Sequence, residues 1–126
     1  MKVELYALCQ GAFNTNGQLT IVNTIDTFVV PNFPVRVSFG LALKLYIYPE
    51  EEGEKTLTIS ILDKENKSII PPIPTSLHIE RLDKASHIAI AINLQNVLFE
   101  KSGAYEVHLE LDGERWGNYA FEIEQR

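Results

Sequence analysis

The sequence has 126 residues, the length of one folded domain, and we expect a single domain over residues 1–126. Hydrophobic residues make up 45% of the chain and charged residues 22%, a composition that excludes a disordered protein. The formal net charge of −6 argues against a protein that binds the phosphate backbone of nucleic acid or anionic lipid. We therefore expect neither nucleic acid nor a membrane as a partner.

The N-terminal segment carries no pattern of a secretory signal, because Glu4 interrupts the apolar stretch that such a signal needs. Cys9 is the single cysteine, which excludes an intrachain disulfide and a cysteine-cluster metal site. A disulfide-free domain fits a reducing compartment, and we expect a cytoplasmic location. Cys9 shares its parity with Val3, Leu5 and Ala7, which indicates a buried, inert thiol.

The first third of the chain predicts a hairpin. An apolar run over residues 3–13 and another over residues 19–30 flank the turn sequence Asn14-Thr15-Asn16-Gly17. Asn-Gly adopts positive φ readily and joins antiparallel strands. Pro31 and Pro34 then bracket a short crossing segment.

The central third begins with the clearest strand signal, over Val35–Ile47. Apolar residues stand at every odd position, where a strand directs them to one face: Val35, Val37, Phe39, Leu41, Leu43, Leu45 and Ile47. Pro49 and the acidic residues 50–54 end this strand in a solvated loop. Calcium binding there is disfavoured, because the cluster is a single loop of glutamates without aspartate.

The remaining strands follow the same alternation. Shorter runs include Leu57, Ile59 and Ile61, then Ile88, Ile90, Ile92 and Leu94, and finally Tyr105, Val107, Leu109 and Leu111. Pro71-Pro72-Ile73-Pro74 favours an extended connection between two of them. Asp112-Gly113 predicts a second hairpin, which leads into a last strand over residues 116–123.

Short strands separated by turns, without a helical pattern, predict an all-β fold. We expect an antiparallel β-sandwich of about eight strands, with a closed barrel as the structural rival. The Pro-rich crossings favour the sandwich, because they suit strands that change sheet. Gly103-Ala104-Tyr105 at the start of a late strand predicts a tyrosine corner, in which the phenol hydroxyl bonds to nearby backbone.

Residues that carry chemistry are sparse. His78, His87 and His108 lack the spacing of metal ligands, and Glu106 and Glu110 beside His108 fit a solvated strand face better than a metal site. The sequence has no Gly-x-Ser-x-Gly elbow, no phosphate-binding glycine loop and no zinc-hydrolase motif. We therefore expect no enzymatic activity, no catalytic residues, no metal and no cofactor.

The aromatic residues are more informative. By parity Tyr46 and Tyr48 face away from the side on which Leu45 and Ile47 lie, and Trp116 alternates against Phe121 and Ile123. Tyrosine and tryptophan that point outward together suit a protein interface or sugar stacking. Tyr46, Tyr48 and Trp116 are thus the candidate binding residues, for a protein partner or for self-association.

Three stretches resemble a family of small bacterial proteins of unknown function. They are Asn16-Gly17-Gln18-Leu19-Thr20-Ile21 followed by Pro31-Asn32-Phe33-Pro34, then Asn93-Leu94-Gln95-Asn96-Val97-Leu98-Phe99, and then Gly103-Ala104-Tyr105-Glu106-Val107 leading into Leu111-Asp112-Gly113-Glu114. With the strands between them they span nearly the whole chain. The resemblance implies a stand-alone β-sandwich of Ig-like or C2-like kind, and it implies no activity and no functional residue.

The sequence therefore favours a non-enzymatic protein-binding or assembly module, which uses a sheet edge or the aromatic residues. The alternative is a small-ligand binder, for example for a carbohydrate, with Trp116 and a tyrosine as the stacking platform. An enzyme would need a cleft in which a histidine and a glutamate converge.

Overall fold

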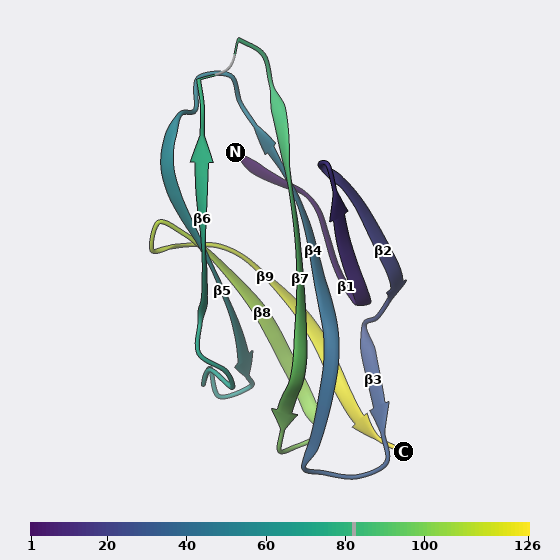
Figure 1. Cartoon of the computed structure of the whole chain (residues 1–126). Coiled ribbons are helices and arrows are strands. Elements are labelled where there is room, and N and C mark those ends of the chain that lie inside the picture. The colour runs from purple at the N-terminus through teal and green to yellow at the C-terminus, as the bar shows by residue number, and fades with distance from the viewer. Residues whose placement is uncertain (82) are drawn as a thin grey trace. The chain divides into compact units, whose positions relative to one another are not determined.

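The computed structural model describes residues 1–81 and 83–126, and strands dominate it (Figure 1). Nine strands are described, and no helix is found among the described residues. They are β1 (Lys2–Thr15), β2 (Gln18–Thr24), β3 (Thr27–Val30), β4 (Val35–Ile47), β5 (Gly53–Asp63), β6 (Ile73–Ile79), β7 (Ser86–Phe99), β8 (Gly103–Leu111) and β9 (Glu114–Gln125). The predicted all-β class is confirmed. In the described part of the chain no helix is long and apolar enough to span a bilayer.

The strands form two sheets. One has four strands in the order β2-β1-β4-β7, and the other has five in the order β3-β9-β8-β5-β6. The chain divides into two compact units that follow the sheets, with residues 1–25, 37–53 and 80–96 in the first and residues 26–36, 54–79 and 97–126 in the second. Each unit is built from segments far apart in sequence, so strand pairing has to be established over long chain separations.

The first hairpin forms as predicted, but the run over residues 19–30 is not one strand. Asn16 and Gly17 both have positive φ, 52° and 84°, and connect β1 to β2. Asn23 also has positive φ, 50°, and β2 ends directly afterwards. β3 then pairs in parallel with β9 in the other sheet. This break accounts for nine described strands in place of about eight.

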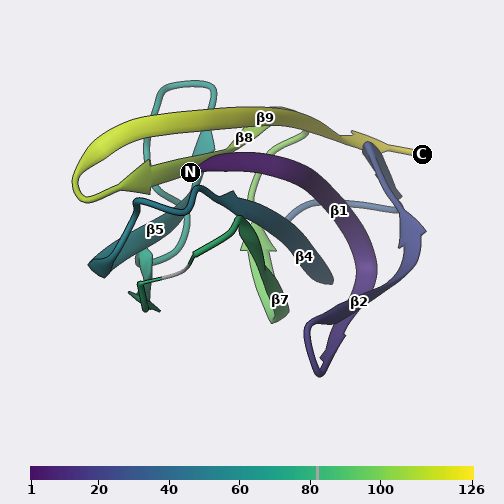
Figure 2. The same cartoon turned by 90° about the horizontal axis from the view of Figure 1, so that it is seen from above.

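The second half of β1 leaves the ladder with β4 after Cys9 and folds over one face of its own sheet. Ala12 packs with Cys9 and Ala42, and Leu19 and Ile21 of β2 lie against this group. Figure 2 shows the strong curvature of β1 along its length. As a result, β4 is buried on both faces from Phe39 to Leu43, and the one-sided burial expected from its alternation does not hold there.

A side chain of β7 holds the second half of β1 in place. The Asn93 amide donates to the Ala12 carbonyl at 2.8 Å and accepts from the Ala12 N–H at 3.1 Å. The amide passes close to Gly40 of β4, where an added Cβ would lie 2.9 Å from Asn93 Oδ1. Asn93 thus replaces the ladder partners that Ala12 loses where β1 departs from β4.

The second sheet has the regular alternation that the sequence predicts. Leu57, Ile59 and Ile61 of β5 are fully buried, as are Val107 and Leu109 of β8. Asp112 and Gly113 connect β8 to β9 with positive φ, and the Asp112 carboxylate accepts the Thr56 N–H at 2.8 Å.

Tyr105 lies at the start of β8, and its hydroxyl donates to the Lys101 carbonyl at 2.6 Å. The predicted bond from the phenol back to nearby backbone is therefore confirmed. The buried Tyr105 ring also stacks on Phe121, with centroids 5.7 Å apart. The turn before β8 is thereby tied to the core of the second unit.

Candidate functional site

An aromatic group lies on the first sheet, on the face of β4 that Tyr46 occupies. The Tyr46 and Tyr48 rings meet edge to face, with centroids 5.1 Å apart and planes at 69°. The His87 ring of β7 meets Tyr46 in the same way at 5.4 Å. Tyr46 is half-buried, whereas Tyr48 and His87 are exposed. Two of the three predicted binding residues thus form one group, which a histidine joins.

Charged residues of β1 complete this group. Lys2 pairs with Tyr46 across the ladder, and its Nζ lies 5.2 Å from the Tyr46 ring centroid, a cation–π distance. The register between β1 and β4 shifts between Val3 and Leu5, so Glu4 is the extra residue of a β-bulge. Glu4 Oε2 lies 2.8 Å from His87 Nε2. Lys2, Glu4, Tyr46, Tyr48 and His87 are called the Tyr46 cluster below.

The loop after β4 fixes one side of the Tyr46 cluster. Glu51 accepts the Tyr48 backbone N–H at 3.0 Å and also bonds the amino group of Met1. Glu54, at the other end of the acidic segment, bonds His78. Glu51 and Glu54 therefore have separate protein partners. Among the described residues no group of three or more His, Cys, Asp or Glu side chains is placed to hold a metal ion.

Trp116 lies in the second unit, on β9. The ladder between β8 and β9 shifts register between Leu109 and Glu110, whose partners are Gly117 and Arg115. Trp116 is the residue left between these two partners, so it too occupies a bulge. A bulge redirects side chains, so the direction of the Trp116 side chain does not follow from simple alternation along β9. The Trp116 side chain is half-buried. A joint surface of Tyr46, Tyr48 and Trp116 stays a prediction.

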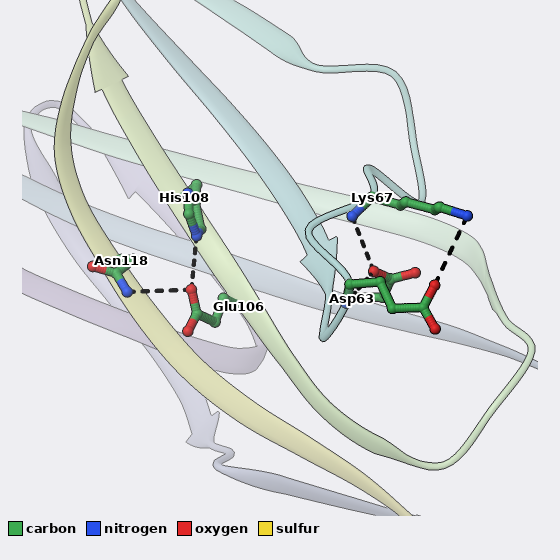
Figure 3. Close-up of polar contacts among 6 residues, drawn as sticks. Asp63, Lys67, Glu106, His108 and Asn118 are labelled. Atoms are coloured by element: carbon green, nitrogen blue, oxygen red, sulfur yellow. Dashed lines mark hydrogen bonds and ion pairs between the residues drawn. The ribbon is translucent and has the colours of Figure 1, made fainter.

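Each histidine contacts one glutamate. His87 bonds Glu4 and His78 bonds Glu54, and both pairs are exposed. His108 Nε2 lies 2.7 Å from Glu106 Oε2, and this histidine side chain is 14% exposed. The same Glu106 oxygen accepts from the Asn118 amide at 3.2 Å (Figure 3). Hydrogen bonds from His108 and Asn118 lower the pKa of Glu106, which stays ionised on the outer face of β8.

A pocket of about 380 Å³ lies in the second unit, between the loop after β5 and the turn before β8. Its lining mixes lysines and carboxylates with apolar side chains: Asp63, Lys64, Glu65, Lys67, Ser68, Ile69, Leu98, Glu100, Lys101, Ser102, Ala104 and Tyr105. Asp63 accepts the backbone N–H of Glu65 at 2.8 Å. It also accepts the backbone N–H of Lys67 at 2.9 Å (Figure 3). These bonds lower the Asp63 pKa and bind its carboxylate to the loop.

Cys9 is buried, and burial raises the pKa of its thiol. Its Sγ donates to the Gly11 carbonyl at 3.2 Å. A thiol held in its protonated form is a poor nucleophile, so Cys9 acts as a packing residue.

A model of a protein family matches residues 4–124, which is nearly the whole chain. The chain belongs to DUF6941, a family of unknown function. The resemblance to an uncharacterised family, inferred from the turn and strand motifs, is confirmed. No curated protein matches the chain.

Similar chains among the solved structures include that of Pseudomonas fluorescens alkylpurine DNA glycosylase AlkC bound to DNA containing an abasic site analog. The similarity has a TM-score of 0.48 with 14% sequence identity, and it covers 94% of this chain and 30% of that chain. It carries no activity or ligand over to the DUF6941 chain.

One expectation about partners is corrected at this point. Nucleic acid had been excluded as a partner from the net charge of −6. That exclusion is withdrawn, and the similar structure is one of a protein bound to DNA. The physical reason is that net charge is a sum over the molecule and does not set the potential over one face.

Sequence reasoning found the two tyrosines and missed the rest of the Tyr46 cluster. His87 was considered only as a metal ligand, and Glu4 only as a break in a signal sequence. Neither bulge has a sequence signature, since a bulge depends on how two strands align. The parity of Tyr46 and Tyr48 was the one usable signal.

Proposed function

We propose that the chain is a non-enzymatic binding module whose Tyr46 cluster contacts a protein partner. The observation that carries the proposal is the edge-to-face contact of Tyr46 with Tyr48 and His87, beside Lys2 and Glu4, on residues that are exposed or half-exposed. Tyrosines supply large apolar contact area and a polar tip, which suits the centre of protein interfaces. The carboxylate, imidazole and ammonium groups supply directional contacts around the rings.

We further propose that the two sheets form a sandwich of Ig-like kind. The tyrosine corner at Tyr105 supports this, since a tyrosine bonded to backbone a few residues upstream is typical of Ig-like domains. The alternation of buried and outward residues on β5 and β8 also supports it. In such a scaffold specificity lies in surface residues and not in the fold itself.

A non-enzymatic role is supported by the way the histidines are used. Each bonds one glutamate on a strand face or loop, and two of the three pairs are well exposed. General acid-base catalysis needs groups that converge on one substrate atom in a cleft. The pocket beside Tyr105 contains no histidine.

The experiment is quantitative cross-linking capture, in a lysate of the source cells, with the wild-type chain, Tyr48→Ala and Val29→Ala. Val29 is an exposed apolar residue of β3 in the second unit and serves as the matched control. We expect a partner that is captured by the wild type and by Val29→Ala and is lost at least about tenfold with Tyr48→Ala. The same captured proteins at the same yield for all three variants would refute a role for the Tyr46 cluster.

Small-ligand binding through Trp116 is the alternative function. Trp116 is the only tryptophan in the chain and is half-buried in its bulge. A carbohydrate that stacks on it would shift its fluorescence emission on titration. An emission spectrum that glycan mixtures leave unchanged would remove this alternative.

A further inference from the structure

The hairpin of β1 and β2 carries no charge from Leu5 to the end of β2. Residues 5–25 contain no Lys, Arg, Asp or Glu, although 22% of the whole chain is charged. Phe13 is 55% exposed on this hairpin and Val22 is 39% exposed. Interface centres are depleted in charged residues in the same way. A charge-free surface that exposes Phe13 and Val22 among uncharged polar residues suits contact with another macromolecule.

The free edge of this hairpin lies along β2. In the described residues β2 is hydrogen-bonded to β1 alone, and Gln18, Thr20 and Val22 are exposed. The two-residue turn at Asn16 and Gly17 makes Thr15 and Gln18 a hydrogen-bonded pair. Along an antiparallel ladder, hydrogen-bonded pairs alternate with pairs that are not hydrogen-bonded. Leu19 and Ile21 belong to the second kind, so their backbone N–H and C=O groups point away from β1.

Sheet edges are usually protected by a charge, a proline or a bulge. Between Gln18 and Val22 this edge has no charge and no proline, and the register with β1 is unbroken. The left-handed conformation of Asn23 limits the regular edge to these five residues. A second strand can therefore add to β2 over this short stretch.

We propose that two copies of this chain associate through antiparallel pairing of their β2 strands, about a two-fold axis at Thr20. In this register Leu19 lies opposite the partner's Ile21, and Ile21 lies opposite the partner's Leu19. These are the residues whose N–H and C=O groups face the open edge, so both pairs are hydrogen-bonded. Thr20 meets the partner's Thr20 at the axis, a favourable cross-strand pair.

The charge distribution restricts a second copy of the chain to an approach through this edge. Two chains of net charge −6 repel each other over most of their surfaces. Approach through the β2 edge places the uncharged stretch of residues 5–25 at the centre of the contact. It also brings Phe13, which lies opposite Thr20 on β1, and Val22 close to the axis on the outer face of each hairpin. The contact is isologous and therefore closes as a dimer.

Sedimentation velocity over a concentration series tests this pairing with the full chain. We expect reversible dimerisation of the wild type, and at least about a tenfold higher dissociation constant for Thr20→Lys, because two ammonium groups meet at the axis. Val29→Lys, a lysine on an exposed strand position in the second unit, should dimerise as the wild type does. A wild type that stays monomeric up to its solubility limit would overturn the proposal, as would equal weakening by both lysines.

A cysteine at the axis tests the register separately. Opposed residues in a pair without hydrogen bonds have Cα atoms about 4.5 Å apart, within the range of a disulfide. Thr20→Cys should therefore oxidise to a covalent dimer much faster than Val29→Cys. The native Cys9 is fully buried and does not interfere. Equal rates for the two variants, with both folded as judged by circular dichroism, would contradict pairing about Thr20.

Discussion

At the scale of single residues, Gly40 is the glycine at which an added side chain would meet the closest contacts. A Cβ there would lie 2.9 Å from Asn93 Oδ1, 3.0 Å from the Ala12 nitrogen and 3.1 Å from the Gly11 carbonyl carbon. Two of these atoms belong to the backbone of β1, which cannot move without loss of its bonds to Asn93. Gly40 is thus required by close approach and not by its φ angle.

Substitution of Gly40 by alanine should destabilise the protein by about 1–3 kcal/mol, because the added methyl overpacks this crossing. Gly11→Ala is the matched control, since its Cβ would meet nothing closer than 3.7 Å. Chemical denaturation of the two variants and the wild type measures the difference. Equal unfolding midpoints for both variants would contradict the crossing described here.

The lowered pKa of Glu106 predicts that the free energy of unfolding depends on pH. Its hydrogen bonds to His108 and Asn118 hold its pKa below the ordinary value of 4.5. A carboxyl whose pKa is lower in the folded state stabilises the protein above its unfolded pKa, and this contribution is lost as pH falls through the folded pKa. The stability difference between wild type and Glu106→Gln should therefore be largest near neutral pH and shrink below pH 4.5.

The measurement is a series of denaturant titrations from pH 7 to about pH 3. Glu110→Gln serves as the control, because Glu110 is exposed on the same strand and shows no hydrogen bond to a histidine. A wild-type advantage over Glu106→Gln that stays constant through this range would show that the His108 contact does not stabilise the carboxylate.

At the scale of elements, the turn between β7 and β8 depends on Tyr105. Its hydroxyl bonds the Lys101 carbonyl at 2.6 Å, while its ring packs against Phe99 and Phe121. The ring supplies apolar burial, and the hydroxyl fixes the path of the chain into β8. The two contributions can be separated because phenylalanine retains the ring.

Tyr105→Phe should lower the free energy of unfolding by about 1–2 kcal/mol, since the Lys101 carbonyl loses its donor while the packing persists. Tyr48→Phe removes an exposed hydroxyl and should change stability by less than about 0.5 kcal/mol. Urea unfolding monitored by circular dichroism measures both. A Tyr105→Phe variant as stable as Tyr48→Phe would mean that the corner bond contributes nothing.

The two β-bulges show how element geometry positions candidate site residues. One places Glu4 within bonding distance of His87, and the other contains Trp116. In both cases one extra residue on one strand changes the direction of a side chain relative to simple alternation. The candidate binding residues therefore depend on strand alignment as much as on strand sequence.

At the scale of the whole molecule, the described ladders join distant parts of the chain. β3 pairs with β9 in parallel, and β1 pairs with β4 although β2 and β3 lie between them in sequence. Such contacts require loop closure before they stabilise the chain. Folding should therefore be slow for a chain of this length.

We expect refolding in milliseconds to seconds, the range of proteins dominated by non-local β pairing. Stopped-flow fluorescence of Trp116, the only tryptophan, measures the rate. Because Trp116 lies on β9, whose partner β8 precedes it by a two-residue turn, circular dichroism should be followed in parallel to report on both sheets. Refolding within microseconds by either probe would contradict the non-local topology.

Sequence alone determined the all-β class, both two-residue hairpins, the strand from Val35 to Ile47 and the bond made by Tyr105. These follow from local causes: period-two apolar residues, Asn-Gly and Asp-Gly turns, and the position of a tyrosine at a strand start. The family assignment followed from the same motifs. The outward parity of Tyr46 and Tyr48 was likewise readable, because β4 is regular in that part.

Tertiary structure alone decided where the strands go and what surrounds the tyrosines. The split between β2 and β3, the fold of the β1–β2 hairpin over β4, and the bulges at Glu4 and Trp116 depend on partners far away in sequence. Alternation in one strand specifies which residues share a face, but the register and the neighbour are set by the strand that pairs with it. Because β1 and β7 both pair with β4, Glu4 and His87, 83 positions apart, come into contact.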